Sequence, residues 1–543
     1  MKQTSPWWHT AAVYQVYPKS FQDSNEDGIG DLPGLISRLD YLQTLGISAI
    51  WLSPVCRSPQ VDNGYDISDY RDIDPMFGTL DDMKRLISEA KKRGIGIILD
   101  LVLNHTSDQH PWFLNALQGP ENPYHDYYIW RDGTEDTPPS DLKAIFGGSA
   151  WQYVPELGKY YFHKFAVQQP DLNWKNPNLR REIYDMINWW LDLGVCGFRL
   201  DVIDQIAKEV ETGVTKNGPM LHPYLQEMCR ETWGGRNCIT VGETWGATVE
   251  LAKQYSNPDG SELSMVFQFE HDGLDKQPGC SKWQMRPLNL LELKEVFARW
   301  QTGLEGSGWN SLFWNNHDLP RIVSRWGNDG AYRERSAKML ALLLHGMGGT
   351  PYIYQGEELG MTNAGFTDIS QYRDLESLNY YREQQQAGKP RQEILEALRA
   401  KSRDNSRTPM QWDGTTGGGF SAAEPWIAMN PNHTEINAAD QLQDPDSVFH
   451  FYRRLIELRK QLPVMVYGSF RLLMPEDPEV FAYSRTYRKE HLVVLCNFYG
   501  SDRPLQEIEV PETARLLLSN AGVPQMPTSP LAPYEARLYY FAD

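Results

Sequence analysis

The chain has 543 residues, of which 52 are Lys or Arg and 71 are Asp or Glu, so its formal net charge is −19. It is longer than one ordinary domain and can bury a large core. The acidic balance argues against partners such as nucleic-acid phosphates or an anionic membrane surface, because both require basic patches.

Residues 1–10 contain no basic region followed by an apolar run, and no stretch reaches the ~18 apolar residues of a membrane span. We therefore expect a soluble, cytoplasmic protein. The six cysteines have no CxxC spacing, so each is expected to be a free thiol rather than a zinc ligand or half of a disulfide. Tryptophan occurs 18 times, and its flat ring also stacks on sugar faces, which is a weak indication of a carbohydrate ligand.

Short β-branched or aromatic runs alternate with amphipathic helical patterns, which is typical of parallel strands joined by crossover helices. Eight runs are present, the number that closes a (β/α)8 TIM barrel. The predicted strands are Val13–Pro18, Ala49–Pro54, Gly96–Asn104, Gly197–Ile203, Ile239–Thr244, Ser264–Phe269, Asn310–Asp318 and Pro351–Glu357.

Helical patterns lie between these strands, and several of them stop at a glycine. Glycine just past a helix is the usual left-handed stop, so Gly46, Gly94, Gly194 and Gly346 are predicted to end helices. The predicted helices are Leu32–Leu45, Leu80–Arg93, Pro177–Leu193, Leu288–Leu304 and Arg335–His345.

The barrel pattern is interrupted twice. Residues 105–174 are rich in Pro, Gly, Trp and Tyr and are too long for a barrel loop, so they are predicted to form an inserted subdomain after strand 3. A second insertion follows strand 8 at about 359–431, and the helix Val448–Leu462 then completes the barrel, which spans 1–104 and 175–465. Alternating runs at Val480–Ser484, Leu492–Asn497 and Ala536–Tyr540 predict a C-terminal antiparallel β domain over 466–543.

Charged side chains occur at the ends of four predicted strands. Arg199 and Asp201 are two residues apart, so both should point to one face of their strand. A structural ion pair is the plain alternative for these two residues alone. Active sites of such barrels lie at the carboxyl ends of the strands, so four charged ends together favour a catalytic site. The residues concerned are His105, Arg199, Asp201, Glu243, His317 and Asp318.

Glycoside hydrolysis needs such a set, because one carboxylate attacks the anomeric carbon and a second protonates the leaving oxygen. Asp201 suits the nucleophile, because the nearby Arg199 favours its ionised form. Glu243 suits the acid/base, because a carboxyl group against apolar rings such as Trp245 holds its proton at neutral pH. A metal site is the competing interpretation, but no HExxH or comparable spacing supports it.

These four strand ends resemble the signature regions of the α-amylase superfamily, family 13 of the glycoside hydrolases, and the resemblance runs nearly end to end. Residues 168–173, 349–358 and 403–412 agree with it. It implies a retaining α-glycosidase with Asp201 as nucleophile, Glu243 as acid/base and Asp318 as transition-state stabiliser. It also implies a blocked, exo-acting sugar pocket, in which Glu376 pairs with Arg407 and the sugar is held by Asp62, Tyr65, His105, Phe165, Gln169, Arg199, His317 and Arg407.

The residue after the nucleophile bears on linkage. Within the superfamily, Val at this position accompanies α-1,6-cleaving oligosaccharidases, and Val202 stands there. Residues 217–219, 242–248 and 263–270 look most like glucan 1,6-α-glucosidases (dextran glucosidases), which are similar to oligo-1,6-glucosidases. The implied substrates are isomaltooligosaccharides, panose and short dextrans, with Trp245 among the binding residues and Lys282 near subsite +1. Residues 140–142 depart from the Asn-Asn-Trp of many relatives, which leaves the preferred chain length open.

Residues 23–31 have oxygen side chains at alternate positions around a central glycine, like the first half of an EF-hand loop, but lack its terminal Glu. A polar turn is the alternative. The resemblance favours a structural Ca²⁺, and no organic cofactor is expected. The implied calcium ligands are Asp23, Asn25, Asp27, the Ile29 carbonyl and Asp31.

Three rival functions remain. A trehalose-6-phosphate hydrolase should need a cationic phosphate pocket, for which the sequence shows no basic cluster. A sucrose isomerase would share the catalytic trio. A non-catalytic, amylase-like binding subunit is disfavoured because Asp201, Glu243 and Asp318 are all present. The expected partner is an oligosaccharide substrate, with no nucleic acid or membrane, and the protein is expected to be a monomer.

Overall fold

The computed structural model describes residues 5–505, 508, 510–522 and 526–543. Its centre is an eight-stranded parallel sheet with the order β11-β10-β9-β5-β2-β1-β13-β12. A parallel bridge between Val266 in β11 and Asn310 just before β12 joins the two edges, so the sheet closes into a barrel. The strands are β1 Val13–Val16, β2 Ala49–Leu52, β5 Gly96–Val102, β9 Gly197–Asp201, β10 Ile239–Glu243, β11 Met265–Phe267, β12 Ser311–Leu312 and β13 Thr350–Tyr354.

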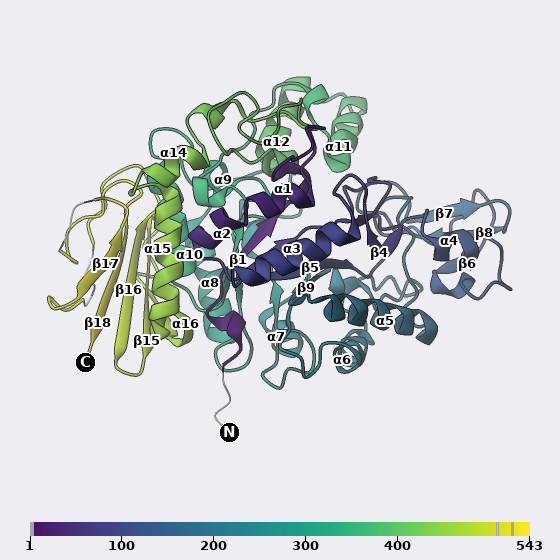
Figure 1. Ribbon diagram of the computed structural model, residues 1–543, viewed down its shortest axis with the longest axis horizontal. Helices are drawn as coiled ribbons and strands as arrows, with labels where there is room; N and C mark the ends of the chain where they lie inside the picture. Colours follow the sequence, from purple (N-terminus) through teal and green to yellow (C-terminus); the bar gives the residue numbers. More distant parts are fainter. Residues whose placement is uncertain (1–4, 506–507, 509, 523–525) are drawn as a thin grey trace.

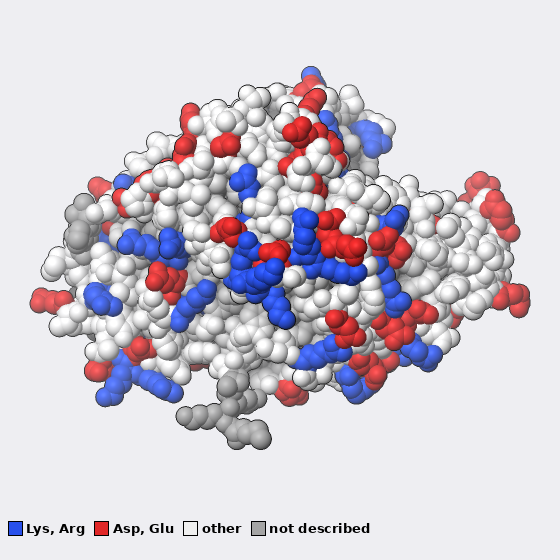
Figure 2. Space-filling model, viewed as in Figure 1, with Lys and Arg blue, Asp and Glu red and all other residues white. Residues whose placement is uncertain are grey.

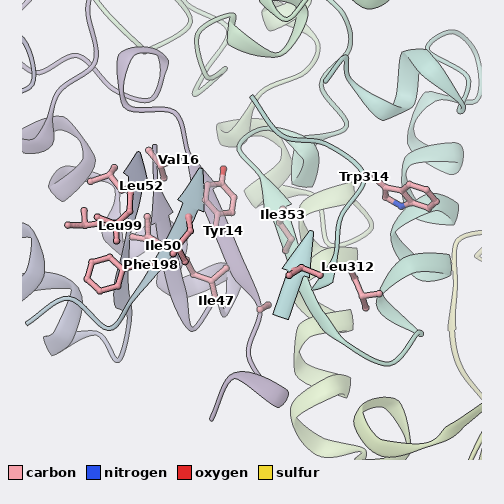
Figure 3. Close-up of a cluster of buried hydrophobic side chains, with 14 of the residues drawn as sticks. Tyr14, Val16, Ile47, Ile50, Leu52, Leu99, Phe198, Leu312, Trp314 and Ile353 are labelled. Carbon is pink, nitrogen blue, oxygen red and sulfur yellow. The ribbon is translucent and has the colours of Figure 1, made fainter. Parts of the chain in front are cut away.

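All eight predicted strands are therefore confirmed, and each ends earlier than predicted, where the chain turns into the loops that carry polar groups. Because side chains alternate along a strand, each strand buries one set against the surrounding helices and another inside the barrel. Tyr14, Ile50 and Phe198 belong to the outer set, which Figure 3 shows packed between strands and helices. Val13 and Trp51 belong to the inner set.

The helices lie around the barrel (Figure 1). The predicted helix over 32–45 is two helices, α1 Leu32–Ser37 and α2 Leu39–Leu45, because Arg38 leaves the helical conformation and its N–H bonds back to Leu35. The remaining barrel helices are α3 Leu80–Lys92, α5 Pro177–Leu193, α6 Leu221–Glu231, α7 Val249–Tyr255, α8 Leu290–Gly303, α9 Ile322–Arg325, α10 Arg333–His345, α15 Val448–Gln461 and α16 Pro463–Tyr467.

Gly46 and Gly194 stop their helices at positive φ, 95° and 107°, as predicted, and Gly94 also has positive φ. Gly346 also ends its helix, as predicted, but it does so without the left-handed conformation, because its φ is −73°. Glycine is needed there for close packing, since a Cβ would lie 2.2 Å from the hydroxyl of Tyr483.

Two segments extend the barrel at the end that carries the site. The stretch after β5 contains α4 Pro111–Ala116 and a small antiparallel sheet of β6 Trp130–Asp132, β8 Lys159–Phe162 and β7 Trp151–Val154. The stretch after β13 contains η6 Glu357–Leu359, α11 Leu375–Gln386, α12 Arg391–Lys401, α13 Asp404–Arg407 and α14 Ala438–Gln443. A short hairpin, β3 Cys56–Arg57 with β4 Asp69–Ile73, lies between β2 and α3. The elements α4, β6, β7 and β8 fall within the predicted insertion 105–174, and α11, α12 and α13 fall within the one at about 359–431, whereas the hairpin and α14 lie outside both. The boundaries of the insertions stay predictions.

The C-terminal part forms a five-stranded antiparallel sheet in the order β14-β15-β16-β18-β17. It packs against α10, whose residues 336–345 are all buried because the helix lies between this sheet and the barrel. The strands are β14 Ser469–Leu473, β15 Val480–Tyr487, β16 Glu490–Asn497, β17 Arg515–Ser519 and β18 Ala536–Ala542.

The distribution of charge on the surface and the state of the cysteines agree with what the composition predicts. On the face shown in Figure 2, basic and acidic side chains are intermixed. The six cysteines are all free thiols. In the described part of the chain, no helix is both long enough and apolar enough to pass through a bilayer.

Candidate active site

Arg199 is the centre of the charged cluster inside the barrel. It is 1% exposed, and its Nη1 lies 2.8 Å from Asp100 in β5 and 2.8 Å from Asp201 at the end of β9. Its Nη2 lies 2.6 Å from Oε2 of Glu243 at the end of β10. Two carboxylates held on neighbouring nitrogens of one guanidinium lie close together, which suits a retaining mechanism better than an inverting one.

Glu243 is held by three donors. Besides Arg199, the backbone N–H of Val202 donates to Oε2 at 3.0 Å, and the indole N–H of Trp245 donates to Oε1 at 3.0 Å. Trp245 is itself stacked on Phe269, with ring centroids 3.9 Å apart. The predicted contact of the acid/base with an aromatic ring is thus present, and it includes a hydrogen bond.

Three buried carboxylates share the one guanidinium of Arg199. Burial raises the pKa of Asp201 well above its ordinary range and that of Asp100 to about 6, while Arg199 opposes both shifts. Arg199 thus favours the ionised form of Asp201, as expected, but burial raises the pKa by more than Arg199 lowers it.

Asp318 lies in a different electrostatic setting. Its Oδ1 is 2.8 Å from Arg407 and 3.1 Å from Arg403, and its Oδ2 is 3.2 Å from Nε2 of His317. Burial would raise its pKa, but His317 and the two guanidinium groups outweigh burial and hold the pKa well below its ordinary range. Asp318 is therefore a permanent negative charge, as a group that stabilises a cationic transition state must be.

His317 is oriented from behind. Gln15 donates to its Nδ1 at 2.8 Å, which assigns the ring hydrogen to Nε2, next to Tyr65 and Asp318. Burial lowers the pKa of His317 to about 3 and that of His105 to about 4, so both rings are neutral at pH 7. Neutral imidazoles suit hydrogen bonding to sugar hydroxyls.

A cavity of about 470 Å³ opens over these groups and is lined by the three predicted catalytic carboxylates. Eight of the predicted substrate-binding residues line it, namely Asp62, Tyr65, His105, Phe165, Val202, Trp245, Lys282 and Glu376. Four lie behind that wall, namely Gln169, Arg199, His317 and Arg407. These four residues support the side chains that line the cavity. The amide nitrogen of Gln169, for example, contacts Asp62 and His105 at 3.2 and 3.1 Å.

Arg403 lies in the lining of the cavity and ties several elements together. Its Nη2 lies 3.4 Å from Asp62 and 2.6 Å from Asp374, and its guanidinium lies 5.3 Å from the ring centroid of Phe146. The carbonyl of Phe146 accepts a hydrogen bond from Asn379 in α11 at 3.1 Å, which ties the insertion after β5 to the one after β13.

The predicted pairing of Glu376 with Arg407 is wrong. Glu376 lies 2.5 Å from Lys282 and 3.7 Å from Arg403, whereas Arg407 bonds to Asp318. The reason is that Glu376 lines the cavity, whereas Arg407 lies behind its wall, with its Nε donating to the carbonyl of His317.

Sequence reasoning assigned no role to several residues that support the site. Asp100 was visible as a polar residue near the end of a predicted strand, and Arg403 lay within the matching run 403–412. Gln15 and Trp51 occur in apolar strands, where a single polar or aromatic residue gives no local signal. Trp51 donates to Asp100 at 3.1 Å.

The predicted calcium loop is folded around its own carboxylates. Asp23 accepts the N–H groups of Asn25, Glu26 and Gly28, and Asp31 caps α1 by accepting from Gly34 at 2.6 Å. In the described part of the chain, no three or more His, Cys, Asp or Glu side chains are grouped to hold a metal ion. Calcium would have to share these oxygens with the N–H groups, so the calcium site stays a prediction.

The chain is similar to known proteins over nearly its whole length. Residues 15–468 match the model of the α-amylase catalytic domain. A glucan 1,6-alpha-glucosidase of Streptococcus pneumoniae is 55% identical over 98% of each chain. An oligo-1,6-glucosidase of Halalkalibacterium halodurans is 51% identical over 99% of each. A trehalose-6-phosphate hydrolase of Bacillus licheniformis superimposes with a TM-score of 0.96 at 47% identity, covering 99% of this chain and 100% of that one.

Proposed function

The chain belongs to the α-amylase family of glycoside hydrolases, and from this premise we propose that it is a retaining, exo-acting α-1,6-glucosidase. Its substrates are isomaltooligosaccharides, panose and short dextrans, from which it removes glucose at the non-reducing end. The relatives named glucan 1,6-alpha-glucosidase and oligo-1,6-glucosidase, at 51–55% identity over nearly the whole chain, support this substrate class.

In this mechanism Glu243 protonates the glycosidic oxygen while Asp201 attacks the anomeric carbon from the opposite face and forms a glycosyl ester. The leaving sugar then departs. Glu243, now ionised, removes a proton from water, which attacks the ester and releases α-glucose. Asp318 holds negative charge beside the ring as its positive charge develops.

The observation that carries the reaction type is the shared guanidinium of Arg199, which holds Asp201 and Glu243 side by side at 2.8 and 2.6 Å. Exo action is supported by the ion pairs of Arg403 with Asp62 and Asp374, which link the walls at one end of the cavity. We take this to be the closed end. The assignment of the α-1,6 linkage rests on Val202 and on the named relatives, and it therefore needs a direct test.

The test is a panel of isomaltose, isomaltotriose, panose, maltose, sucrose and trehalose 6-phosphate at equal concentrations. We expect kcat/KM to be highest on the α-1,6-linked sugars. ¹H NMR of the first turnovers should show α-glucose before mutarotation. Initial β-glucose would exclude the two-step mechanism, and a preference for maltose would exclude the linkage assignment.

Trehalose-6-phosphate hydrolysis is the second candidate, because a protein of that name has nearly the same fold. The cavity lining contains Lys216 and Lys282, but Lys282 is ion-paired with Glu376. A phosphate ester would therefore meet one unpaired cation. Selective cleavage of trehalose 6-phosphate in the panel would favour this candidate.

We also infer a cytoplasmic, monomeric enzyme with a structural Ca²⁺ at residues 23–31. Six free cysteines support a reducing compartment. Sedimentation of the purified protein tests the monomer, and melting curves with Ca²⁺ and with EDTA test the calcium site.

A further inference from the structure

One wall of the active-site cavity contains two polar residues that the mechanism does not use. Gln205 ends the short turn η4 Ile203–Gln205, directly after Val202, and Lys216 lies beside the loop that follows Glu243. A Cβ on Gly246 of that loop would be 3.8 Å from Cδ of Lys216. Because the acid/base contacts the glycosidic oxygen, the wall on its side faces the leaving sugar.

Among the described residues, none is a hydrogen-bond partner of the side-chain amide of Gln205. The residue is 1% exposed, its Oε1 is buried without a hydrogen bond, and its amide nitrogen bonds to no described residue. Buried polar groups without partners are rare in folded proteins and cost stability.

The other buried glutamines show how unusual this is. In the described part of the chain, each of them donates through its amide nitrogen to a neighbouring group, so Gln205 alone is bound at neither end. The others are Gln15, Gln169, Gln268, Gln301, Gln355, Gln411 and Gln441.

Lys216 adds a donor to the same wall. It is half-buried and forms no ion pair with the described carboxylates, in contrast to Lys282, which is 2.5 Å from Glu376. The amide nitrogen of Gln205, unlike its oxygen, is not fully buried. Together with the ammonium group of Lys216 it supplies donors that match the oxygen atoms of sugar hydroxyl groups.

We propose that Gln205, with Lys216 beside it, forms a polar subsite that hydrogen-bonds the hydroxyl groups of the leaving sugar. This inference rests on the proposed function, because it takes Glu243 as the acid/base and the closed end as the site of the terminal glucose. The subsite selects substrates whose leaving group is a sugar over glucosides with a flat, apolar leaving group.

The test compares kcat/KM for isomaltose and for p-nitrophenyl α-glucoside in Gln205→Met, which keeps the length of the side chain and removes its amide. We expect about a tenfold loss on isomaltose, the effect of one good hydrogen bond, and a change below about twofold on the aryl glucoside. Thermal stability should stay equal or rise, because an unsatisfied amide is removed. Lys216→Met should lower the ratio of kcat/KM for isomaltose to kcat/KM for the aryl glucoside severalfold.

Gln301→Met is the matched control. This buried amide is fully bonded, since it donates to the carbonyl of Gly348 and accepts its N–H, both at 2.8 Å. Its loss should lower the melting temperature and leave the ratio of the two substrates unchanged.

An equal loss on both substrates in Gln205→Met, or no loss on isomaltose, would overturn the subsite. A wild-type enzyme that cleaves maltose but not isomaltose would contradict the α-1,6 assignment instead. The subsite is then judged by the ratio of maltose to the aryl glucoside, so the two failures are distinguishable.

Discussion

Val202 has φ 35° and ψ 44°, in the left-handed region where a β-branched residue is strained. The conformation aims its N–H at Glu243 while its side chain lines the cavity. One residue therefore positions the acid/base through its backbone and shapes the cavity through its isopropyl group.

Val202→Ala keeps the N–H and removes two methyl groups. We expect the ratio of kcat/KM for maltose to that for isomaltose to rise severalfold, because the wall beside the scissile bond becomes wider. Val210→Ala, a similarly buried valine outside the cavity lining, is the control. An unchanged ratio in Val202→Ala would remove Val202 from the linkage argument.

Asp201→Asn and Glu243→Gln should each lower kcat by roughly three or more orders of magnitude, because each removes a group that forms or breaks a bond in the reaction. Circular dichroism and melting curves should stay native-like, since both amides can still accept from Arg199. Near-normal turnover by either variant would be incompatible with the proposed roles.

At the scale of single elements, η6 contains two buried carboxyl groups, Glu357 and Glu358. Tyr452 and Asn315 donate to Glu357 at 2.9 and 2.7 Å, but no cation is ion-paired with it in the described part of the chain. Burial raises the pKa of Glu357 to about 7, and these hydrogen bonds oppose the shift only in part.

This carboxyl group should make stability pH-dependent. The folded state binds the proton of Glu357 more tightly than the unfolded state does. The contribution of this proton to the free energy of unfolding is therefore complete below about pH 4.5. It falls by up to about 1.4 kcal/mol per pH unit as the pH rises towards 7. Glu357→Gln, which mimics the protonated form, should therefore gain stability relative to wild type between pH 5 and 8. Melting curves test this, with the exposed Glu305→Gln as control, and a constant difference across this range would contradict it.

The loop over residues 23–31 joins β1 to α1 and gives the calcium proposal its test. Ca²⁺ that binds only the folded state should raise the melting temperature above that measured in EDTA. At a Ca²⁺ concentration one hundred times Kd, the free energy of unfolding should rise by about 2.7 kcal/mol. Asp27→Ala should abolish the difference and Asp81→Ala, an exposed aspartate in α3, should keep it. Equal melting temperatures with Ca²⁺ and with EDTA would favour the alternative, in which residues 23–31 are a polar turn without a calcium site.

At the scale of the whole molecule, α10 connects the barrel to the C-terminal sheet. The hydroxyl of Tyr483 donates to the carbonyl of Leu343 at 2.7 Å, and Arg485 donates to that of Gly346 at 2.9 Å. Residues 336–345 of α10 are buried on all sides and most of them are apolar, so this helix would be unfavourable in water and the sheet is part of the folding unit.

A chain that ends after Gly468 should therefore be insoluble or strongly destabilised, because it exposes α10. The measurement is the soluble fraction and the melting temperature, with Tyr483→Phe in the full chain as the milder variant. A truncated chain with native activity and stability would show that the barrel folds independently.

Features that depend on local geometry were predictable from the sequence. Alternation of apolar residues revealed the eight strands, and the spacing of two placed Arg199 and Asp201 on one face, because side-chain direction repeats every second residue in a strand. The catalytic trio was predictable because the carboxyl ends of barrel strands converge.

Only the tertiary structure decided the contacts between residues distant in the sequence. Arg403 meets Asp62, 341 positions away, and Glu376 pairs with Lys282 rather than with Arg407. Burial, which outweighs Arg199 at Asp201 and leaves the amide of Gln205 without a partner, depends on how all the elements pack. No local pattern encodes that packing, so the sequence by itself determined the barrel and the residues proposed to be catalytic, and the fold determined the electrostatic surroundings of these residues and the walls of the site.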